Sequence, residues 1–341
     1  MMRKALRQVS YWIPLFIGLS VIVYLFSEEF KSMSFIDIHI TWKMGIGVLG
    51  AILFILFRDI LVSYRFCMFA GEKLSLGQAF RVHVLCEFTA AVTPASVGGG
   101  GAIFLFMHRE GIPVGKSTAV MISCVFLDEL FLTVCLPFAL LFFPWNELFV
   151  GTSLLQSGIS FVFFLVYFLV ALWTGILYWA LFRGPDKIKN LLLRLFSIRI
   201  LRRWHNKMES FTDDLVISSQ EMKGKPFSFW CKNFVLTVLS WSFRFLVVNA
   251  LLFAFSDGAD YLLTFFQQLV LWNVMTASPT PGGSGVGELL FKEYYAAFFS
   301  SANMIFLAII SWRVITYYIY LLAGTIIVPN WLKGVKRSIS R

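Results

Sequence analysis

The sequence predicts an all-α polytopic membrane protein, with about six full transmembrane helices and two Pro/Gly-broken re-entrant hairpins in an inverted repeat. Three observations lead to this fold class. The 341 residues are 58% hydrophobic and only 14% charged, with a mean hydropathy of +0.77, so polar side chains are too few to cover a soluble globule. Long apolar runs alternate with basic loops, and two Pro/Gly-rich breaks occur at corresponding positions of the two halves.

Six apolar runs approach or exceed the roughly 20 residues that cross about 30 Å of hydrocarbon. They cover 11–27, 43–66, 116–143, 152–182, 228–255 and 303–328. The first run follows a basic start, and Ser27-Glu28-Glu29-Phe30 after it offers no small-residue cleavage site. We therefore interpret the first run as a signal-anchor span that remains part of the protein.

Basic residues set the expected orientation. If the N-terminus is cytoplasmic, most of the 29 Lys and Arg residues fall in cytoplasmic segments, as the positive-inside rule requires. Both termini are then cytoplasmic, and the net charge of +10 needs no nucleic-acid partner. The segment 183–226 is basic, with apolar residues at mostly helical spacing, which predicts one or two amphipathic helices at the cytoplasmic bilayer surface.

Two shorter apolar stretches, 76–110 and 261–300, each predict a helix, a break and a second helix that re-enters the membrane. The breaks are Thr93-Pro94-Ala95-Ser96-Val97-Gly98-Gly99-Gly100-Gly101 and Ser278-Pro279-Thr280-Pro281-Gly282-Gly283-Ser284-Gly285-Val286-Gly287. Arg58-x-Ile60-Leu61-Val62 also resembles Arg244-x-Leu246-Val247-Val248. We infer two copies of one unit, at 43–143 and 228–328, inserted with opposite orientations as in many transporters.

Each break leaves backbone groups unpaired at membrane depth, which is tolerable only against protein or a water-filled cavity. The helices that start near Gly98–Gly101 and Gly285–Glu288 would direct their positive N-terminal ends toward the membrane interior. Such ends can bind an anionic group, for example a lipid phosphate.

Charged residues inside apolar segments are costly and should face the protein interior. The functional hypothesis is a polar chamber in which Arg58, Arg244 and Arg313 bind phosphate while acids balance charge or relay protons; the alternative is a set of structural ion pairs. Arg65 and Arg81 flank the first hairpin and are interpreted as cytoplasmic anchors that attract headgroups. The candidate substrate-binding residues are Arg58, Arg65, Arg81, Glu87, Thr93, Pro94, Gly98, Gly99, Asp128, Glu129, Arg244, Pro279, Thr280, Pro281, Gly282, Gly283, Gly285, Glu288 and Arg313. No catalytic residue, metal or cofactor is expected.

The string Pro279-Thr280-Pro281-Gly282-Gly283-Ser284-Gly285-Val286-Gly287-Glu288 closely resembles the PTPGG-x-G-x-x-E signature of the lysylphosphatidylglycerol synthase transmembrane family. The first hairpin agrees, with Arg65-Phe66 before it, Arg109-Glu110-Gly111-Ile112 after it and Asp128-Glu129 in the next span. The resemblance implies a flippase-like translocase in a bacterial or archaeal cytoplasmic membrane, which moves a phospholipid such as aminoacylated phosphatidylglycerol. Gly100-Gly101 departs from the family pattern, which leaves the headgroup open.

The resemblance also bears on chemistry and partners. Bifunctional synthases of this family continue into a soluble aminoacyl-transfer domain, whereas this chain ends at Arg341 after a short basic tail. We therefore expect a transporter rather than an enzyme, with membrane lipids as partners and a separate lipid-modifying synthase as a possible supplier. Two alternatives stay open: an intramembrane lipid-modifying transferase, with Asp257-x-x-Asp260 as half of a Mg²⁺ site, and an ion-coupled carrier of a small anion.

Overall fold

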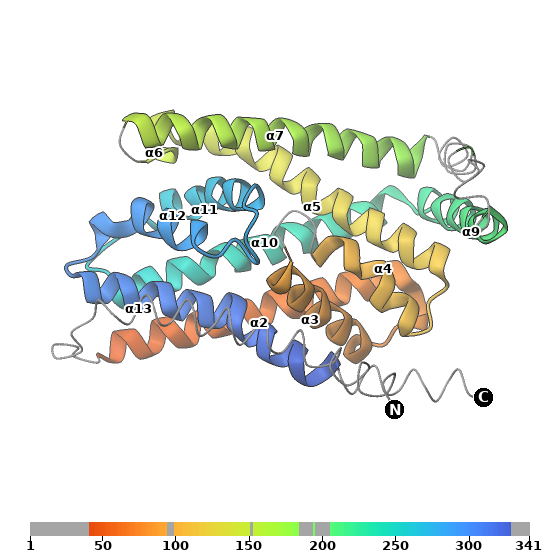
Figure 1. Cartoon of the computed structure of the whole chain (residues 1–341), viewed down its shortest axis with the longest axis horizontal. Helices are drawn as coiled ribbons and strands as arrows, with labels where there is room; N and C mark the ends of the chain where they lie inside the picture. Colours follow the sequence, from red (N-terminus) through yellow and green to blue (C-terminus); the bar gives the residue numbers. More distant parts are fainter. Residues whose placement is uncertain (1–40, 94–98, 151–152, 184–193, 195–204, 329–341) are drawn as a thin grey trace, which may run out of the picture.

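The computed structural model describes residues 41–93, 99–150, 153–183, 194 and 205–328, and the regular elements in these ranges are helices (Figure 1). Five helices are long and apolar enough to cross a membrane. They are α2 (Trp42–Ala70), α5 (Val114–Phe142), α7 (Ser153–Phe182), α10 (Phe227–Phe255), and a last span made of α13 (Ala302–Arg313), the π-helical segment η5 (Val314–Tyr318) and helix that continues to Val328. The predicted all-α multi-pass class is confirmed; the predicted span 11–27 lies outside the described residues.

The short helices begin where the sequence supplies capping side chains. Ser75 and Gln78 form a capping box at the start of α3 (Leu76–Val92), after the short helix η2 (Gly71–Lys73). Asp260 caps α11 (Tyr261–Thr276), and its carboxylate accepts hydrogen bonds from the backbone N–H groups of Leu262 and Leu263, both at 3.0 Å. Asp260 therefore acts as a helix cap. This favours a turn, rather than half of a Mg²⁺ site, as the role of Asp257-x-x-Asp260.

The two halves of the chain have the same order of helices. In the first half, α2 is followed by α3, a break, α4 (Gly99–Arg109) and α5. In the second half, α10 is followed by α11, a break, α12 (Val286–Tyr295), the short helix η4 (Ala296–Phe298) and the last span. This is the order that the predicted repeat requires. Between the halves lie α6 (Trp145–Leu148), α7 and α9 (His205–Lys223).

The first helices of the two halves, α2 and α10, pack against each other in an antiparallel pair (Figure 1). At one end, Gly47 of α2 lies so close to Ala250 and Ala254 of α10 that an added Cβ would overlap them. At the other end, the ring of Phe69 packs against Phe229 at 5.4 Å between centroids. Small residues allow this close approach of helix backbones, as is common between membrane helices.

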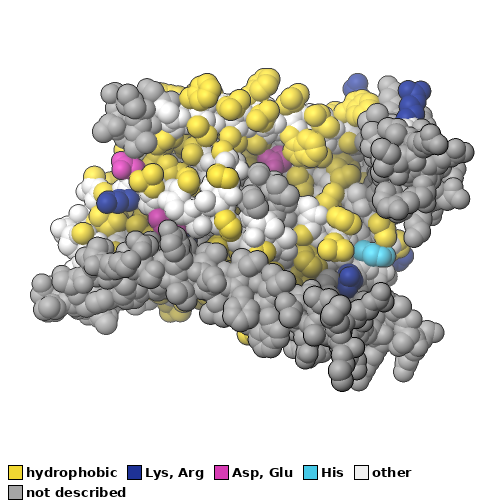
Figure 2. Space-filling model, viewed as in Figure 1, with side chains coloured by type: hydrophobic (Ala, Val, Ile, Leu, Met, Phe, Trp, Pro, Cys, Tyr) yellow, Lys and Arg dark blue, Asp and Glu magenta, His cyan; other side chains and the backbone are white. Residues whose placement is uncertain are grey.

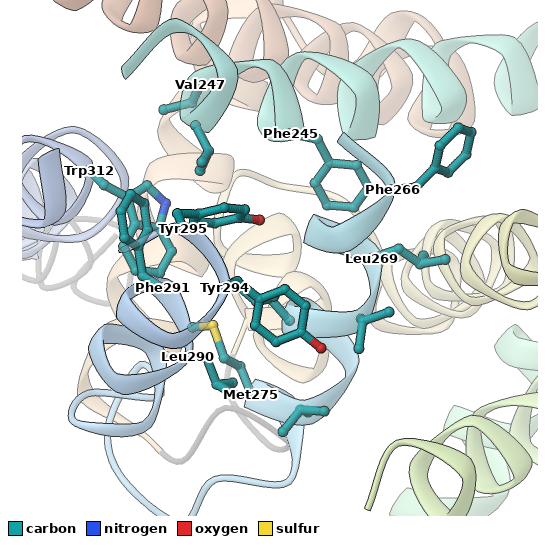
Figure 3. Close-up of a cluster of buried hydrophobic side chains, with 14 of the residues drawn as sticks. Phe245, Val247, Phe266, Leu269, Met275, Leu290, Phe291, Tyr294, Tyr295 and Trp312 are labelled. Carbon is teal, nitrogen blue, oxygen red and sulfur yellow. The ribbon is translucent and has the colours of Figure 1, made fainter. Parts of the chain in front are cut away.

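Two large groups of buried apolar side chains hold the helices together, and a third, smaller group joins α3 to the last span. One joins α10 to α13 with α5, α6 and α7, and Figure 3 shows part of it, including Phe245, Phe291 and Tyr295. The second large group joins α2, α3, α4 and α5 with Leu177 and Leu181 of α7 and with Met222 of α9. On the face seen in Figure 2, hydrophobic side chains spread over the described surface, while the visible Lys and Arg lie toward its two ends. That distribution suits helices whose sides face lipid.

The segment 183–226 is helical over 205–223, where α9 packs against the beginning of α5. Glu221 of α9 forms an ion pair with Lys116 of α5 at 3.2 Å. The prediction of a helix in this loop is confirmed for α9, whereas 184–193 and 195–204 lie outside the described residues.

Candidate functional site

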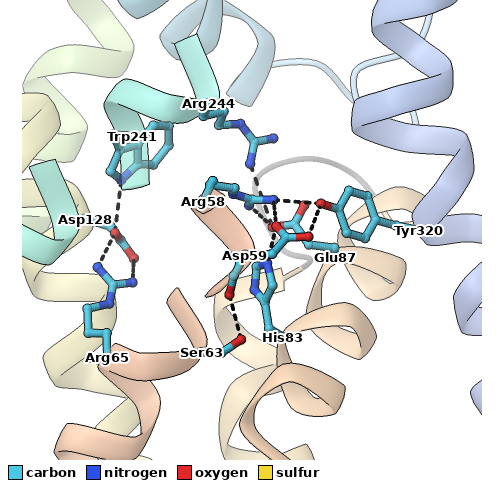
Figure 4. Close-up of polar contacts among 10 residues, drawn as sticks. All are labelled: Arg58, Asp59, Ser63, Arg65, His83, Glu87, Asp128, Trp241, Arg244 and Tyr320. Carbon is cyan, nitrogen blue, oxygen red and sulfur yellow. Dashed lines mark hydrogen bonds and ion pairs between the residues drawn. The ribbon is translucent and has the colours of Figure 1, made fainter. Parts of the chain in front are cut away.

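Six polar side chains form a cluster where α2, α3, α10 and the last span meet (Figure 4). Its members are Arg58, Asp59, His83, Glu87, Arg244 and Tyr320. Asp59 is the most enclosed acid: its carboxylate accepts a hydrogen bond from the Tyr320 hydroxyl at 2.6 Å and one from Arg58 Nη1 at 3.0 Å, and lies 2.9 Å from His83 Nε2. Such dense pairing offsets the desolvation of charges inside a membrane protein.

Glu87 of α3 is shared by two arginines that occupy matching positions in the two halves. Arg58 Nη2 donates to Glu87 Oε1, and Arg244 Nη1 lies 3.7 Å from the same oxygen. The formal charges of the two arginines balance those of Asp59 and Glu87. Of the three arginines predicted to share one polar chamber, the structure brings Arg58 and Arg244 together, whereas Arg313 lies against the loop described below.

Arg244 is held differently from Arg58. Its guanidinium carbon lies 4.0 Å from the centroid of the Trp272 ring and 5.8 Å from that of Trp241. Within the described residues, Arg244 makes its ion pair with Glu87 at 3.7 Å but no hydrogen bond. Stacking on an indole stabilises the cation while its in-plane N–H groups stay available. Arg244 can therefore bind an oxyanion without first losing a hydrogen bond.

Arg65 forms a second buried ion pair, away from this cluster. Its guanidinium donates two hydrogen bonds to Asp128 of α5, at 2.7 and 2.8 Å, and a third to Thr237 of α10 at 2.6 Å. The Trp241 indole N–H also donates to Asp128, at 3.0 Å. The side chain of Arg65 is only 3% exposed, so the expectation of a cytoplasmic anchor is wrong for this residue. Its partner is on a distant helix, and local sequence gave no indication of it.

The break of the second half is a compact loop fixed by Arg313 and Glu288. Arg313 Nε and Nη2 donate to the Glu288 carboxylate at 2.6 and 2.8 Å. Nη1 and Nη2 of Arg313 also donate to the carbonyl oxygens of Gly282 and Gly283, at 3.3 and 3.1 Å. Every guanidinium nitrogen of Arg313 is therefore occupied, which favours the structural ion-pair interpretation of this arginine.

The N-terminus of α12 is occupied by a side chain of the same loop. The backbone N–H of Gly285 donates to Glu288 Oε2 at 2.6 Å, so this carboxylate supplies the negative charge that a helix start attracts. The expectation that this end binds an external anion is wrong for the described arrangement. Within the loop, Thr280 Oγ1 donates to the Ser284 carbonyl at 2.7 Å, while Pro279 and Pro281 flank Thr280 in the chain.

The two breaks contact each other in the centre of the molecule. The backbone N–H of Gly282 donates to the carbonyl oxygen of Thr93, at the end of α3, at 3.3 Å. The Tyr317 hydroxyl donates to the carbonyl of Ala91 at 3.0 Å, and its ring lies against Gly282. These two hydrogen bonds join the ends of the two breaks, while Pro94 and Gly98 lie outside the described residues.

The remaining candidates lie apart from one another. Arg81 is exposed and pairs with Glu110 at 3.1 Å. Gly99 begins α4, and an added Cβ there would lie 3.1 Å from the Cys86 carbonyl oxygen. Glu129 has an enclosed carboxylate oxygen, Oε2, without a hydrogen-bond partner among the described residues.

Three residues of the cluster, Asp59, His83 and Tyr320, were not among the predicted site residues, and neither was Trp272, on which Arg244 stacks. His83 precedes Glu87 by four positions, so the two share one face of α3, and this spacing was a usable signal. Asp59 follows Arg58 directly in an apolar run. Tyr320 gave no signal, because its partner Asp59 lies 261 positions away in the chain.

Comparison with known proteins agrees with the motifs. The family model for the lysylphosphatidylglycerol synthase TM region matches residues 3–324. A similar protein, described as a UPF0104 membrane protein of Archaeoglobus fulgidus, is 23% identical over 266 residues, which cover 76% of this chain and 77% of the relative. The match spans both halves of the chain and the loop between them. The chain therefore belongs to the lysylphosphatidylglycerol synthase transmembrane-region family.

Proposed function

We propose that this protein is a lipid translocase, which moves a phospholipid or another phosphate-bearing lipid between the two leaflets of the membrane. The headgroup passes through the polar site between the two halves, and the acyl chains stay in the bilayer. Aminoacylated phosphatidylglycerol is one substrate that the family relationship suggests. In this proposal the two broken segments are re-entrant hairpins of an inverted repeat, which reach the centre from opposite faces.

The observation that carries this proposal is how the guanidinium of Arg244 is held. Three buried arginines, Arg58, Arg65 and Arg313, donate short hydrogen bonds to carboxylates. Arg244 instead stacks on Trp272 and shares the carboxylate of Glu87 at 3.7 Å. A membrane-buried arginine with donors to spare is a functional-site hypothesis by default, and a lipid phosphate is the anion most abundant around such a protein.

The contact between the two breaks supports the same proposal. Gly282 and Thr93 belong to different halves and are joined by a single backbone hydrogen bond at 3.3 Å. The cluster around Arg58 and Arg244 also joins the halves, since Tyr320 of the second half donates to Asp59 of the first. Both contacts lie at the interface between the halves, where the proposed headgroup site is.

Transport of fluorescent lipids by purified protein in liposomes tests this function. We expect wild-type protein to move labelled phosphatidylglycerol between leaflets, measured as fluorescence that becomes accessible to a membrane-impermeant quencher. Arg244→Gln should lower the initial rate by about ten- to hundredfold, because hydrogen bonds to a charged group contribute about 1.5–3 kcal/mol. Lys116→Gln, which removes a basic residue of the α5–α9 contact, is the matched control and should keep the rate. Absence of protein-dependent movement for anionic and zwitterionic lipids alike would contradict the proposal.

We also propose that the protein itself does not aminoacylate lipid, and that a separate synthase supplies a modified lipid where one is used. Co-expression with and without such a synthase tests this. The proposal requires aminoacylated lipid to form only with the synthase and to reach the outer leaflet only with this protein. Formation of modified lipid by this protein alone would favour the transferase alternative.

A further inference from the structure

We propose that binding of a phosphate headgroup at Arg244 is coupled to the uptake of one proton by Glu87. The inference rests on the proposed headgroup site, and it adds that loading of the site depends on pH. The structural basis is that one carboxylate oxygen, Glu87 Oε1, is the shared counterion of two arginines that an incoming phosphate would contact.

Glu87 is the acid of the cluster that can exchange its partners. Asp59 has three partners from three helices, namely Arg58, His83 and Tyr320, and its side chain is 5% exposed. Among the described residues, Glu87 forms ion pairs with the two guanidiniums alone, and its side chain is 17% exposed, as is that of Arg244. A phosphate that approaches Arg244 therefore competes with Glu87, whereas Asp59 stays fixed.

The groups that face Glu87 show why a proton must follow. They are Arg58 and Asp59 on α2, His83 on its own helix α3, Arg244 on α10, and Tyr320 on the last span. The two arginines already balance the two acids. A phosphodiester would add one negative charge, which is costly at low dielectric unless it is neutralised. His83 Nε2 lies 2.9 Å from Asp59 Oδ1, so its polar contact is with Asp59 and not with the carboxylate that the phosphate would displace.

The exchange conserves charge at the cluster. The Glu87 carboxylate takes one proton from water, forms an O–H bond and loses its ionic attraction to Arg244 and Arg58. The guanidinium N–H groups then donate to the phosphate oxygens in its place. By linkage, a fall in pH strengthens headgroup binding, by at most about tenfold per pH unit for a single coupled proton. A proton gradient across the membrane would then favour loading from the more acidic side.

Calorimetry with a short-chain lipid measures the proton directly. The full-length protein in detergent is titrated with dihexanoylphosphatidylglycerol in two buffers that differ in ionisation enthalpy, so that the difference in heat gives the protons taken up per lipid bound. We expect close to one proton for wild type. Glu87→Gln should take up none, and its affinity should be independent of pH and higher than that of wild type at neutral pH. Glu221→Gln, the same change in a surface ion pair, should keep the wild-type proton count.

Each outcome bears on a different claim. Binding with no proton uptake by wild type would overturn the coupling and leave the proposed function intact, whereas no binding at all would contradict the headgroup site itself. Loss of uptake in His83→Gln with uptake retained in Glu87→Gln would assign the proton elsewhere and would also overturn the proposal. The wild-type count needs no variant, so the test holds even if Glu87→Gln fails to fold.

Discussion

At the scale of single residues, the described structure divides the buried charges into fixed pairs and exchangeable ones. Arg65 with Asp128, and Arg313 with Glu288, form short two-point contacts that connect separate helices. Arg244 instead makes a single longer contact, at 3.7 Å, with a carboxylate that it shares with Arg58. Buried pairs of the first kind position helices, and their removal is costly because the remaining charge is left uncompensated.

The pair of Arg65 and Asp128 gives a prediction of stability. Asp128→Ala should destabilise the protein by about 3–5 kcal/mol, since it leaves a guanidinium that is 3% exposed without its counterion. The measurement is unfolding by dodecyl sulfate in mixed micelles. The double variant Arg65→Met/Asp128→Leu should lose less stability than Asp128→Ala, and an equal or larger loss would contradict a purely electrostatic cause.

At the scale of elements, the break after α11 is a rigid loop rather than a flexible gap. Gly282, Gly283 and Gly285 all have positive φ, of 58°, 67° and 85°, and Arg313 donates to two carbonyl groups of the loop. Gly282 is the most restricted of them, because an added Cβ would overlap the Tyr317 ring. The glycines of the family signature therefore have a backbone role here.

Alanine substitutions at these glycines separate the effect of a positive φ from the effect of steric overlap with a neighbouring side chain. Gly282→Ala should destabilise the protein by about 1–3 kcal/mol or more, from backbone strain and the overlap with Tyr317. Gly285→Ala, with positive φ but open space, should cost less. Gly258→Ala, in open space without a positive φ, should be neutral. Unfolding in detergent measures all three, and equal effects at the three glycines would show that neither cause operates.

At the scale of the whole molecule, the antiparallel pair of α2 and α10 places equivalent arginines of the two halves side by side. Arg58 and Arg244 both approach Glu87, and the ends of the two breaks meet through Gly282 and Thr93. A central polar site enclosed by apolar helices is the arrangement that an inverted repeat produces at its interface.

The orientation of the whole molecule gives a further prediction. If both termini are cytoplasmic, as the distribution of basic residues predicts, the loop before α11 faces outward and the loop before α10 faces inward. In a variant without its five native cysteines, Gly258→Cys should react with a membrane-impermeant maleimide in intact cells. Gly224→Cys should react only after permeabilisation. The reverse labelling pattern would show that the protein has the opposite orientation to the one proposed.

Sequence alone determined the class of the protein, the five described spans and the positions of both breaks. These features are local, because a segment in lipid must satisfy its own backbone hydrogen bonds and must be apolar along its whole length. The family signature at Pro279 to Glu288 could also be identified from the sequence. The match of Arg58 with Arg244 also came from sequence, since two copies of one unit keep a common order of residues.

Only the tertiary structure decided which charges are paired and which can bind. Arg65 joins Asp128 across 63 positions, Tyr320 joins Asp59 across 261, and Arg313 is committed to Glu288 and the loop before it. Pairing depends on which faces of distant helices come together, and apolar composition does not encode that choice. For the same reason, the sequence predicted three arginines as phosphate ligands, whereas the packing of the helices shows that Arg244 is the one whose N–H donors are not already used in hydrogen bonds to described residues.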